Sequence, residues 1–177
     1  TRDKSQKYFH FILIAKDTIG HRALRELSST AWYNSYYDRG MERVPTTKAE
    51  LSAVVNAYKG HLIATSACMG GELSTYALTM SVAEDKGEKN IVQECYNHIV
   101  EFMTDCLDIF GDDFYIECAP STTVDQMITN RKLYKIAQAF NDVMEQNNFE
   151  PIKKNMGLFI KQIKEMLPNA DGKLVSQ

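Results

Sequence analysis

The chain has 177 residues, 44% of them hydrophobic and 24% charged, and its formal net charge is −3. This size suits one domain, or one large piece of a domain, and is enough to bury a hydrophobic core. The acidic balance argues against binding nucleic acid through charge alone, and no apolar run approaches the roughly 20 residues that cross a membrane. The polar start, residues 1–7, does not resemble a signal peptide. Because the first residue is not Met, we expect a fragment or a processed product.

The cysteines are widely spaced, and no two of them form a CxxC motif. They are Cys68, Cys95, Cys106 and Cys118. Disulfide frameworks are typical of small secreted chains, whereas scattered thiols are typical of reducing compartments. We therefore expect reduced cysteines and a cytoplasmic location.

The first elements in chain order are a strand and two helices. Tyr8–Ala15 is an apolar, aromatic-rich run that predicts a strand. A helix is expected over about 17–33, with Asp17 as its N-cap. Residues 34–45 are expected to form an aromatic, glycine-containing loop. Thr47 and Glu50 then form the capping-box pattern that opens a second helix.

The middle of the chain begins with a second apolar run, 61–67, which predicts a buried strand ended by a Gly70-Gly71 turn. A short helix over 72–80, a polar stretch over 81–90 and a long helix over 91–110 are expected next. A turn at 111–113 leads into a third strand over 114–118, and a helix follows from 124 to 141 or beyond. Pro151 fits the first position of a last helix, which should end near residue 167.

Strands that alternate with helices favour an α/β fold built from parallel βαβ units. Three strands are few for a closed barrel. The chain is therefore either part of a larger α/β unit or contains strands that the pattern does not reveal.

Three side chains with metal-binding or catalytic chemistry lie in or next to the first two strands. His10 stands in the first strand, and Cys68 and Glu72 flank the glycine turn after the second. In α/β proteins, ligands and metals gather at the carboxyl ends of strands. Each residue also has a structural interpretation: His10 as a packed core residue, Cys68 as a small buried hydrophobe, and Glu72 as a first-turn residue favoured by the helix dipole. The residues alone leave both interpretations open.

The other histidines carry a weaker signal. His21 and His61 have no ligand-like partner nearby in the sequence and are expected at surface or cap positions. His98 is expected in mid-helix, where contacts with Glu94 or Glu101 account for it.

Three sequence segments carry a resemblance to a known family. Residues 10–17 read HFILIAKD, residues 60–72 read GHLIATSACMGGE, and residues 110–117 read FGDDFYIE. Tyr36-Tyr37 and Pro45 add a fourth piece between the first two. In this order, the segments resemble the PHP (polymerase and histidinol phosphatase) domain of the bacterial and phage replicative DNA polymerase III alpha subunit, and the similarity extends over about residues 8–141.

The resemblance implies part of a distorted (β/α)7 barrel with a metal cluster held by His, Asp, Glu and Cys. It assigns His10 and Cys68 as metal ligands. Glu72 is expected to orient a ligand or a water molecule without binding the metal itself. Imidazole and thiolate suit zinc, and manganese is the other divalent ion considered. The family's early HxH motif would lie before Thr1, and its late DxH motif is absent after residue 141. The expected metal site is therefore incomplete.

Three functional hypotheses follow. The first is the PHP portion (residues 1–141, with a helical extension over 142–177) of a DNA polymerase III alpha-like replication protein, serving mainly as a structural platform. The remainder of the polymerase, its proofreading or clamp subunits, and DNA through the parent protein are then the expected partners, and no membrane is expected. The second is a metal-dependent phosphoesterase or 3′–5′ exonuclease, and the third is a non-enzymatic interaction module. The sequence contains no polymerase (nucleotidyltransferase) motif.

Overall fold

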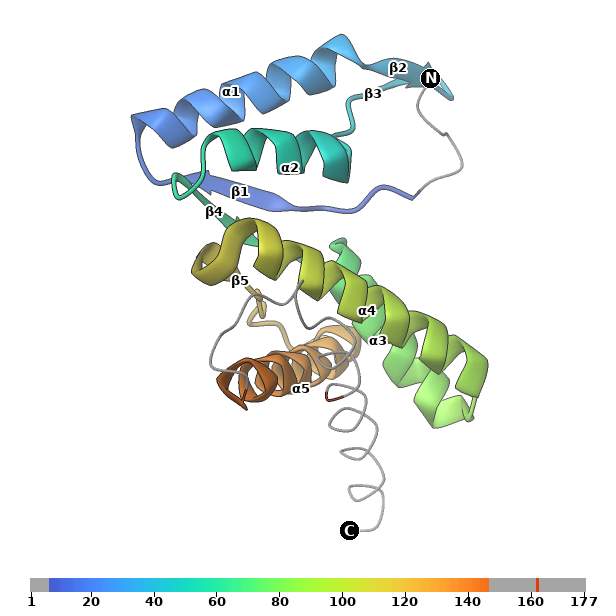
Figure 1. Ribbon diagram of the computed structural model, residues 1–177. Helices are drawn as coiled ribbons and strands as arrows, with labels where there is room; N and C mark the ends of the chain where they lie inside the picture. The colour runs from blue at the N-terminus through green and yellow to red at the C-terminus, as the bar shows by residue number, and fades with distance from the viewer. Residues whose placement is uncertain (1–6, 147–161, 163–177) are drawn as a thin grey trace.

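The computed structural model describes residues 7–146 and residue 162, and its elements are labelled in Figure 1. In chain order they are β1 (Ile12–Ala15), α1 (Thr18–Tyr33), β2 (Tyr36–Asp38), β3 (Met41–Arg43), α2 (Lys48–Ala57), β4 (Leu62–Thr65), α3 (Glu72–Lys86), α4 (Lys89–Phe110), the 3-10 helix η1 (Gly111–Asp113), β5 (Phe114–Tyr115) and α5 (Val124–Gln146). In Figure 1, β1 and β4 lie between α1 and α2 above and the helices α3, α4 and α5 below.

Three of the strands form a sheet in the order β1-β4-β5, β2 and β3 form a separate two-stranded sheet, and the mixed helix and strand content is that of an α/β fold. The expected parallel pairing holds for β4 and β5, but β1 runs antiparallel to β4, with Ile12 opposite Thr65 and Ala15 opposite Leu62. The prediction that all strands are parallel was therefore wrong for β1. Parallel strands require a crossover connection, but the connection between β1 and β4, which holds α1, the β2–β3 hairpin and α2, brings the chain into β4 in the opposite direction.

The starts of α1 and α2 are as the sequence predicts. The Asp17 carboxylate accepts a hydrogen bond from the backbone N–H of Gly20 at 2.8 Å, which makes Asp17 the N-cap of α1. Thr47 and Glu50 form the complete capping box, with the Thr47 N–H donating to the Glu50 carboxylate at 2.8 Å. Both caps satisfy backbone donors that have no partner inside the helix.

The loop predicted over residues 34–45 is instead a β-hairpin. Its strands β2 and β3 pair antiparallel, with Tyr36 opposite Arg43. Arg39 and Gly40 both have positive φ, at 48° and 76°, as a type I′ hairpin turn requires. Arginine is an uncommon residue for this backbone region, so the sequence lacks the usual Asn-Gly or Asp-Gly signal.

The polar stretch predicted over 81–90 is largely helical. Helix α3 continues past the expected end at Met80 to Lys86 and stops at Gly87, which has a φ of 71°. Glu and Lys are good helix formers, and Ala83 continues the buried face of α3, so polarity there marks an exposed helix side.

The core lies among α3, α4, α5 and the sheet. Its fully buried side chains include Leu62, Leu73, Ile99, Leu133, Ile136, Phe140 and Val143. Phe102 of α4 packs edge-on against Phe11 and Phe114, with ring centroids 6.3 and 6.0 Å apart. Helix α5 continues through residue 141 to Gln146, and the helix predicted over 151–167 lies outside the described residues. The proposed boundary at residue 141 stays a prediction.

Candidate functional site

His10 and Cys68, which are 58 residues apart in the chain, meet at one end of the sheet. The imidazole Nδ1 of His10 lies 3.3 Å from the Sγ of Cys68, and both residues are exposed. The antiparallel pairing of β1 with β4 causes this, because it brings the start of β1 beside the carboxyl end of β4. The backbone N–H of His10 also donates to the carbonyl of Gly70 at 2.9 Å, and this bond fixes the two segments against each other.

The loop that presents Cys68 has an unusual and well-bonded backbone. Ala67 is buried and has a φ of 60°, a left-handed conformation that costs a non-glycine residue roughly 1 kcal/mol. Hydrogen bonds of the preceding residue keep the backbone in this conformation. The Ser66 N–H donates to the carbonyl of Tyr115 at 3.0 Å, and the Ser66 hydroxyl accepts from the Glu117 N–H at 2.9 Å. Strained residues of this kind persist where surrounding bonds enforce them, and they gather at functional sites.

The two glycines after Cys68 are required by close packing. A Cβ on Gly70 would lie 2.8 Å from the Nδ1 of His10, and a Cβ on Gly71 would lie 2.2 Å from the carbonyl oxygen of Ser66. Glycine at these positions therefore lets the His10 ring reach Cys68 and lets the loop close tightly onto the start of α3.

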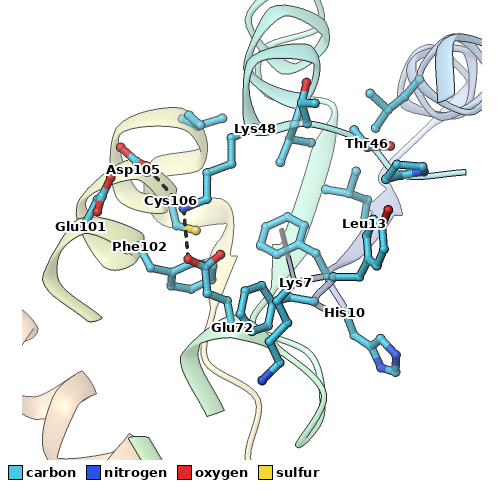
Figure 2. A pocket seen from close by; sticks show the side chains of 18 of the residues that line it. Lys7, His10, Leu13, Thr46, Lys48, Glu72, Glu101, Phe102, Asp105 and Cys106 are labelled. Atoms are coloured by element: carbon cyan, nitrogen blue, oxygen red, sulfur yellow. Dashed lines mark hydrogen bonds and ion pairs between the residues drawn. The ribbon is translucent and has the colours of Figure 1, made fainter. Parts of the chain in front are cut away.

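Glu72 faces away from this pair. Its carboxylate contacts the ammonium of Lys48 at 3.1 Å, inside a cleft of about 1260 Å³ between α2 and α4. Figure 2 shows the carboxylate of Glu72 directed at Lys48, while the imidazole of His10, which also lines this cleft, is turned away from that ion pair. Burial lowers the pKa of Lys48, but neighbouring carboxylates, Glu72 foremost, outweigh it, so the pKa is raised. That Glu72 orients a ligand or a water at His10 and Cys68 stays a prediction. The contact of Glu72 with Lys48 does not favour it.

Glu117, at the end of β5, is a residue of this sheet end that the sequence did not single out. Its carboxylate accepts a hydrogen bond from the Thr65 hydroxyl at 2.9 Å, and its backbone bonds to Ser66. Within residues 7–146 and 162, no group of three or more His, Cys, Asp or Glu side chains could hold a metal ion. The structure therefore places two donors together, His10 and Cys68.

Two of the remaining histidines make contacts that the sequence did not predict, whereas His21 is exposed, as expected. His61 was expected to lack a ligand-like partner, but its Nδ1 lies 2.7 Å from the Asp17 carboxylate. The hydrogen bond from Gly20 and then that from His61 lower the pKa of Asp17. His98 stacks on Tyr76, with ring centroids 4.3 Å apart and planes at 10°. Neither contact has a local sequence signal, because both join different elements.

The four cysteines are all free, as predicted: Cys68 and Cys118 are exposed, and Cys95 and Cys106 are buried. Burial raises the pKa of the Cys106 thiol above its usual range, so that thiol stays protonated in the core. Within the part of the chain that the structure describes, no helix has the length and apolar character that a membrane crossing requires.

Comparisons with known proteins agree with the sequence resemblance. The chain is 40% identical over 136 residues to "Probable DNA polymerase YorL" of Bacillus subtilis and to "DNA-directed DNA polymerase" of Bacillus phage SPbeta. It is 33% identical over 132 residues to "DNA polymerase III subunit alpha" of Aquifex aeolicus. These matches cover 75–76% of this chain but only 10% of each relative. The PHP domain profile matches residues 2–121, and the chain belongs to the PHP domain family.

Proposed function

We propose that this chain is the PHP portion of a DNA polymerase III alpha-like replication protein and acts mainly as a structural platform with a partial metal site. The observation that carries the proposal is the contact between His10 and Cys68 at the sheet end. Family membership and the polymerase names of the relatives support the replication context. The chain spans about a tenth of those relatives' length, so a role in a polymerase is proposed for it and not taken over from them as established.

The two donors fit a zinc-like ion. Zinc binds nitrogen at about 2.0–2.1 Å and thiolate sulfur at about 2.3 Å, and a tetrahedral angle then separates the two donors by about 3.5 Å. The 3.3 Å between the His10 nitrogen and the Cys68 sulfur is close to that value. When bound, such an ion would supply Lewis-acid activation of a phosphate ester.

The structural-platform role is supported by the small number of metal-binding side chains that point toward His10 and Cys68. Glu72 is engaged by Lys48, and Glu117 by Thr65, so neither carboxylate is directed at the pair. A complete cluster would take ligands from polypeptide other than the described residues, as in a larger barrel to which this sheet contributes three strands. The proposal includes that (β/α)7 barrel, a cytoplasmic location, and the remaining polymerase with its proofreading or clamp subunits as partners.

Metal content of the purified chain, measured by mass spectrometry, tests the proposal. His10→Ala and Cys68→Ser remove one donor each, and Cys118→Ser is the matched control because Cys118 is also an exposed free thiol. We expect substoichiometric zinc or manganese that is lost in both donor variants and kept in the control. Full loading together with hydrolysis of phosphate esters would contradict the platform role and favour the phosphoesterase or exonuclease alternative. Equal metal content in all four proteins would contradict the assignment of His10 and Cys68.

A further inference from the structure

One face of the three-stranded sheet exposes large apolar side chains. Because side chains alternate along a strand, Ile12 and Ile14 of β1 lie on the same side of the sheet. The register adds Ile63, which is opposite Ile14, and Thr65, which lies between Ile12 and Tyr115. Ile12, Ile14 and Tyr115 are 39%, 49% and 53% exposed. Apolar patches of this kind on a protein surface mark contact surfaces. We call this side the open face.

The opposite face of the same sheet is covered. Phe11, Leu13 and Ala15 alternate with the exposed isoleucines and pack against the buried core. Leu62 and Ala64 of β4 are buried on that side. Among the described residues, the helices therefore cover one face of the sheet, whereas sheets in α/β proteins are usually covered on both.

The His10–Cys68 pair lies at one end of the open face. His10 stands two residues before Ile12 in the same extended run, so alternation places it on the open side. Cys68 follows β4 and contacts His10, and both residues are exposed. The loop continues with Gly70 and Gly71, which have no side chain to keep a second molecule away from the pair.

The pair supplies half of a closed zinc site. Structural zinc sites have four protein ligands in a tetrahedron, and two cysteines with two histidines are one of the common sets. Within residues 7–146 and 162, no third His, Cys, Asp or Glu side chain joins His10 and Cys68 in such a group. A second copy related by a two-fold axis brings the same two donors, because both molecules present the same patch to such an interface. Together the two copies offer two imidazoles and two thiolates.

We propose that two copies of this chain pack with their open faces together and share one zinc ion between their two His10–Cys68 pairs. This inference rests on the proposed metal site and adds its missing ligands, its stoichiometry and its partner. The zinc ion joins the copies at one end of the interface. Along the rest of it, Ile12, Ile14 and Tyr115 of each copy are removed from water, which stabilises the dimer.

Face-to-face packing suits the distances that a shared ion requires. Packed sheets lie about 10 Å apart, so an ion midway between them is about 5 Å from each sheet, within reach of side chains that point into the space between. When the two-fold axis runs along the strands, both His10–Cys68 pairs stand at the same end of the interface. The apolar side chains of β1 and β5 then face those of the other copy.

Titration of the purified, metal-free chain with zinc chloride tests the proposal. The mass of the protein is followed by light scattering, and bound zinc is measured by mass spectrometry. We expect a monomer without metal and a dimer with zinc, with an end point at one zinc ion for two chains. His10→Ala and Cys68→Ser should each abolish the zinc-dependent dimer. Cys118→Ser, which removes the other exposed thiol, should keep it.

A second pair of variants tests the open face. Ile14→Lys places a charge on it, and Val82→Lys makes the same change at an exposed position of α3, outside the sheet. In the presence of zinc, we expect Ile14→Lys to raise the dissociation constant of the dimer by about tenfold or more, because a charge is costly to bury without a partner. Val82→Lys should leave that constant unchanged, and circular dichroism checks that both variants fold. Equal dissociation constants for the two variants would overturn the assignment of the open face.

Three results would overturn the shared zinc ion, and they separate it from the proposed function. One zinc ion per chain on a protein that stays monomeric would keep His10 and Cys68 as ligands and exclude the second copy, leaving the open face to other parts of a larger polymerase. Absence of zinc from the folded wild type would remove the shared ion and the proposed metal site together. A zinc-dependent dimer that persists in both donor variants would place the ion elsewhere.

Discussion

Two histidines stand at opposite ends of the same sheet, and their surroundings differ. His61, just before β4, contacts a carboxylate that also caps α1, so its partner Asp17 has both oxygens engaged in local structure. His10, just before β1, contacts a thiol held by a strained loop, and among the described residues no carboxylate is bonded to His10 or Cys68. The comparison teaches that a histidine beside a possible ligand becomes a site candidate only where the partner is not already used to hold the fold together.

The largest effect is expected at the His61 end, from Gly20→Ala. A Cβ there would lie 2.1 Å from the backbone carbonyl oxygen of His61, and backbone cannot move aside as a side-chain tip can. We expect a loss of about 3 kcal/mol in the free energy of unfolding, measured with urea. Ser28→Ala, at an exposed position of the same helix, is the control. Equal stability of the two variants would mean that the tight packing of α1 on His61 is not real.

Gly70→Ala makes the same change at the His10 end, with a smaller expected cost of about 1 kcal/mol. The new Cβ would lie 2.8 Å from the His10 ring, which can rotate away. Its distinctive result is a displaced imidazole, seen as shifted His10 ring resonances in NMR spectra while those of His61 stay in place. Unchanged His10 resonances would argue that Gly70 does not set the ring position.

Asp17→Asn should weaken the fold in a pH-dependent way. The folded-state pKa of Asp17 is lowered, first by the Gly20 hydrogen bond and then by His61, so its carboxylate stabilises the fold above its unfolded pKa. That contribution disappears as the pH falls through the folded pKa. Urea midpoints of the wild type and the variant should therefore differ at neutral pH and converge in acid. A difference that grows in acid would contradict the assignment.

Lys48→Met is expected to have the smallest effect on stability, under about 1 kcal/mol and weaker in high salt, because the Lys48–Glu72 pair is partly exposed. The variant also tests whether Glu72 takes part in metal binding at the His10–Cys68 pair. We expect that it does not, so the metal content of the variant should equal that of the wild type. Lys59→Met, at an exposed position just after α2, is the control. A gain of metal in Lys48→Met alone would show that Glu72 serves the His10–Cys68 pair once released.

Local signals predicted the fold well where a few neighbouring residues decide the structure. Asp17 and the Thr47–Glu50 capping box are such cases, because the bonds that define them span three residues. The strand direction of β1 and the hairpin turn at Arg39 were missed. The first depends on packing between distant segments, and the second on a backbone conformation that arginine rarely adopts.

Some features of the candidate site could likewise be predicted from the sequence, whereas others depend on packing between distant segments. The resemblance to a known family predicted that His10 and Cys68 belong together, although nothing local joins residues 58 apart. The direction of the Glu72 side chain depends on Lys48, 24 residues earlier, and on how α2 sits against α4. The pairing of His61 with Asp17 depends likewise on the antiparallel contact of β1 and β4.

Cobalt substitution tests most directly whether His10 and Cys68 act as one metal site. Cobalt(II) bound to a thiolate gives a sulfur-to-metal charge-transfer absorption, so titration of the purified chain reports on Cys68 itself. We predict that the absorption appears in the wild type and in Cys118→Ser, weakens in His10→Ala and vanishes in Cys68→Ser. Its absence from a folded wild type, or its persistence in Cys68→Ser, would contradict the account.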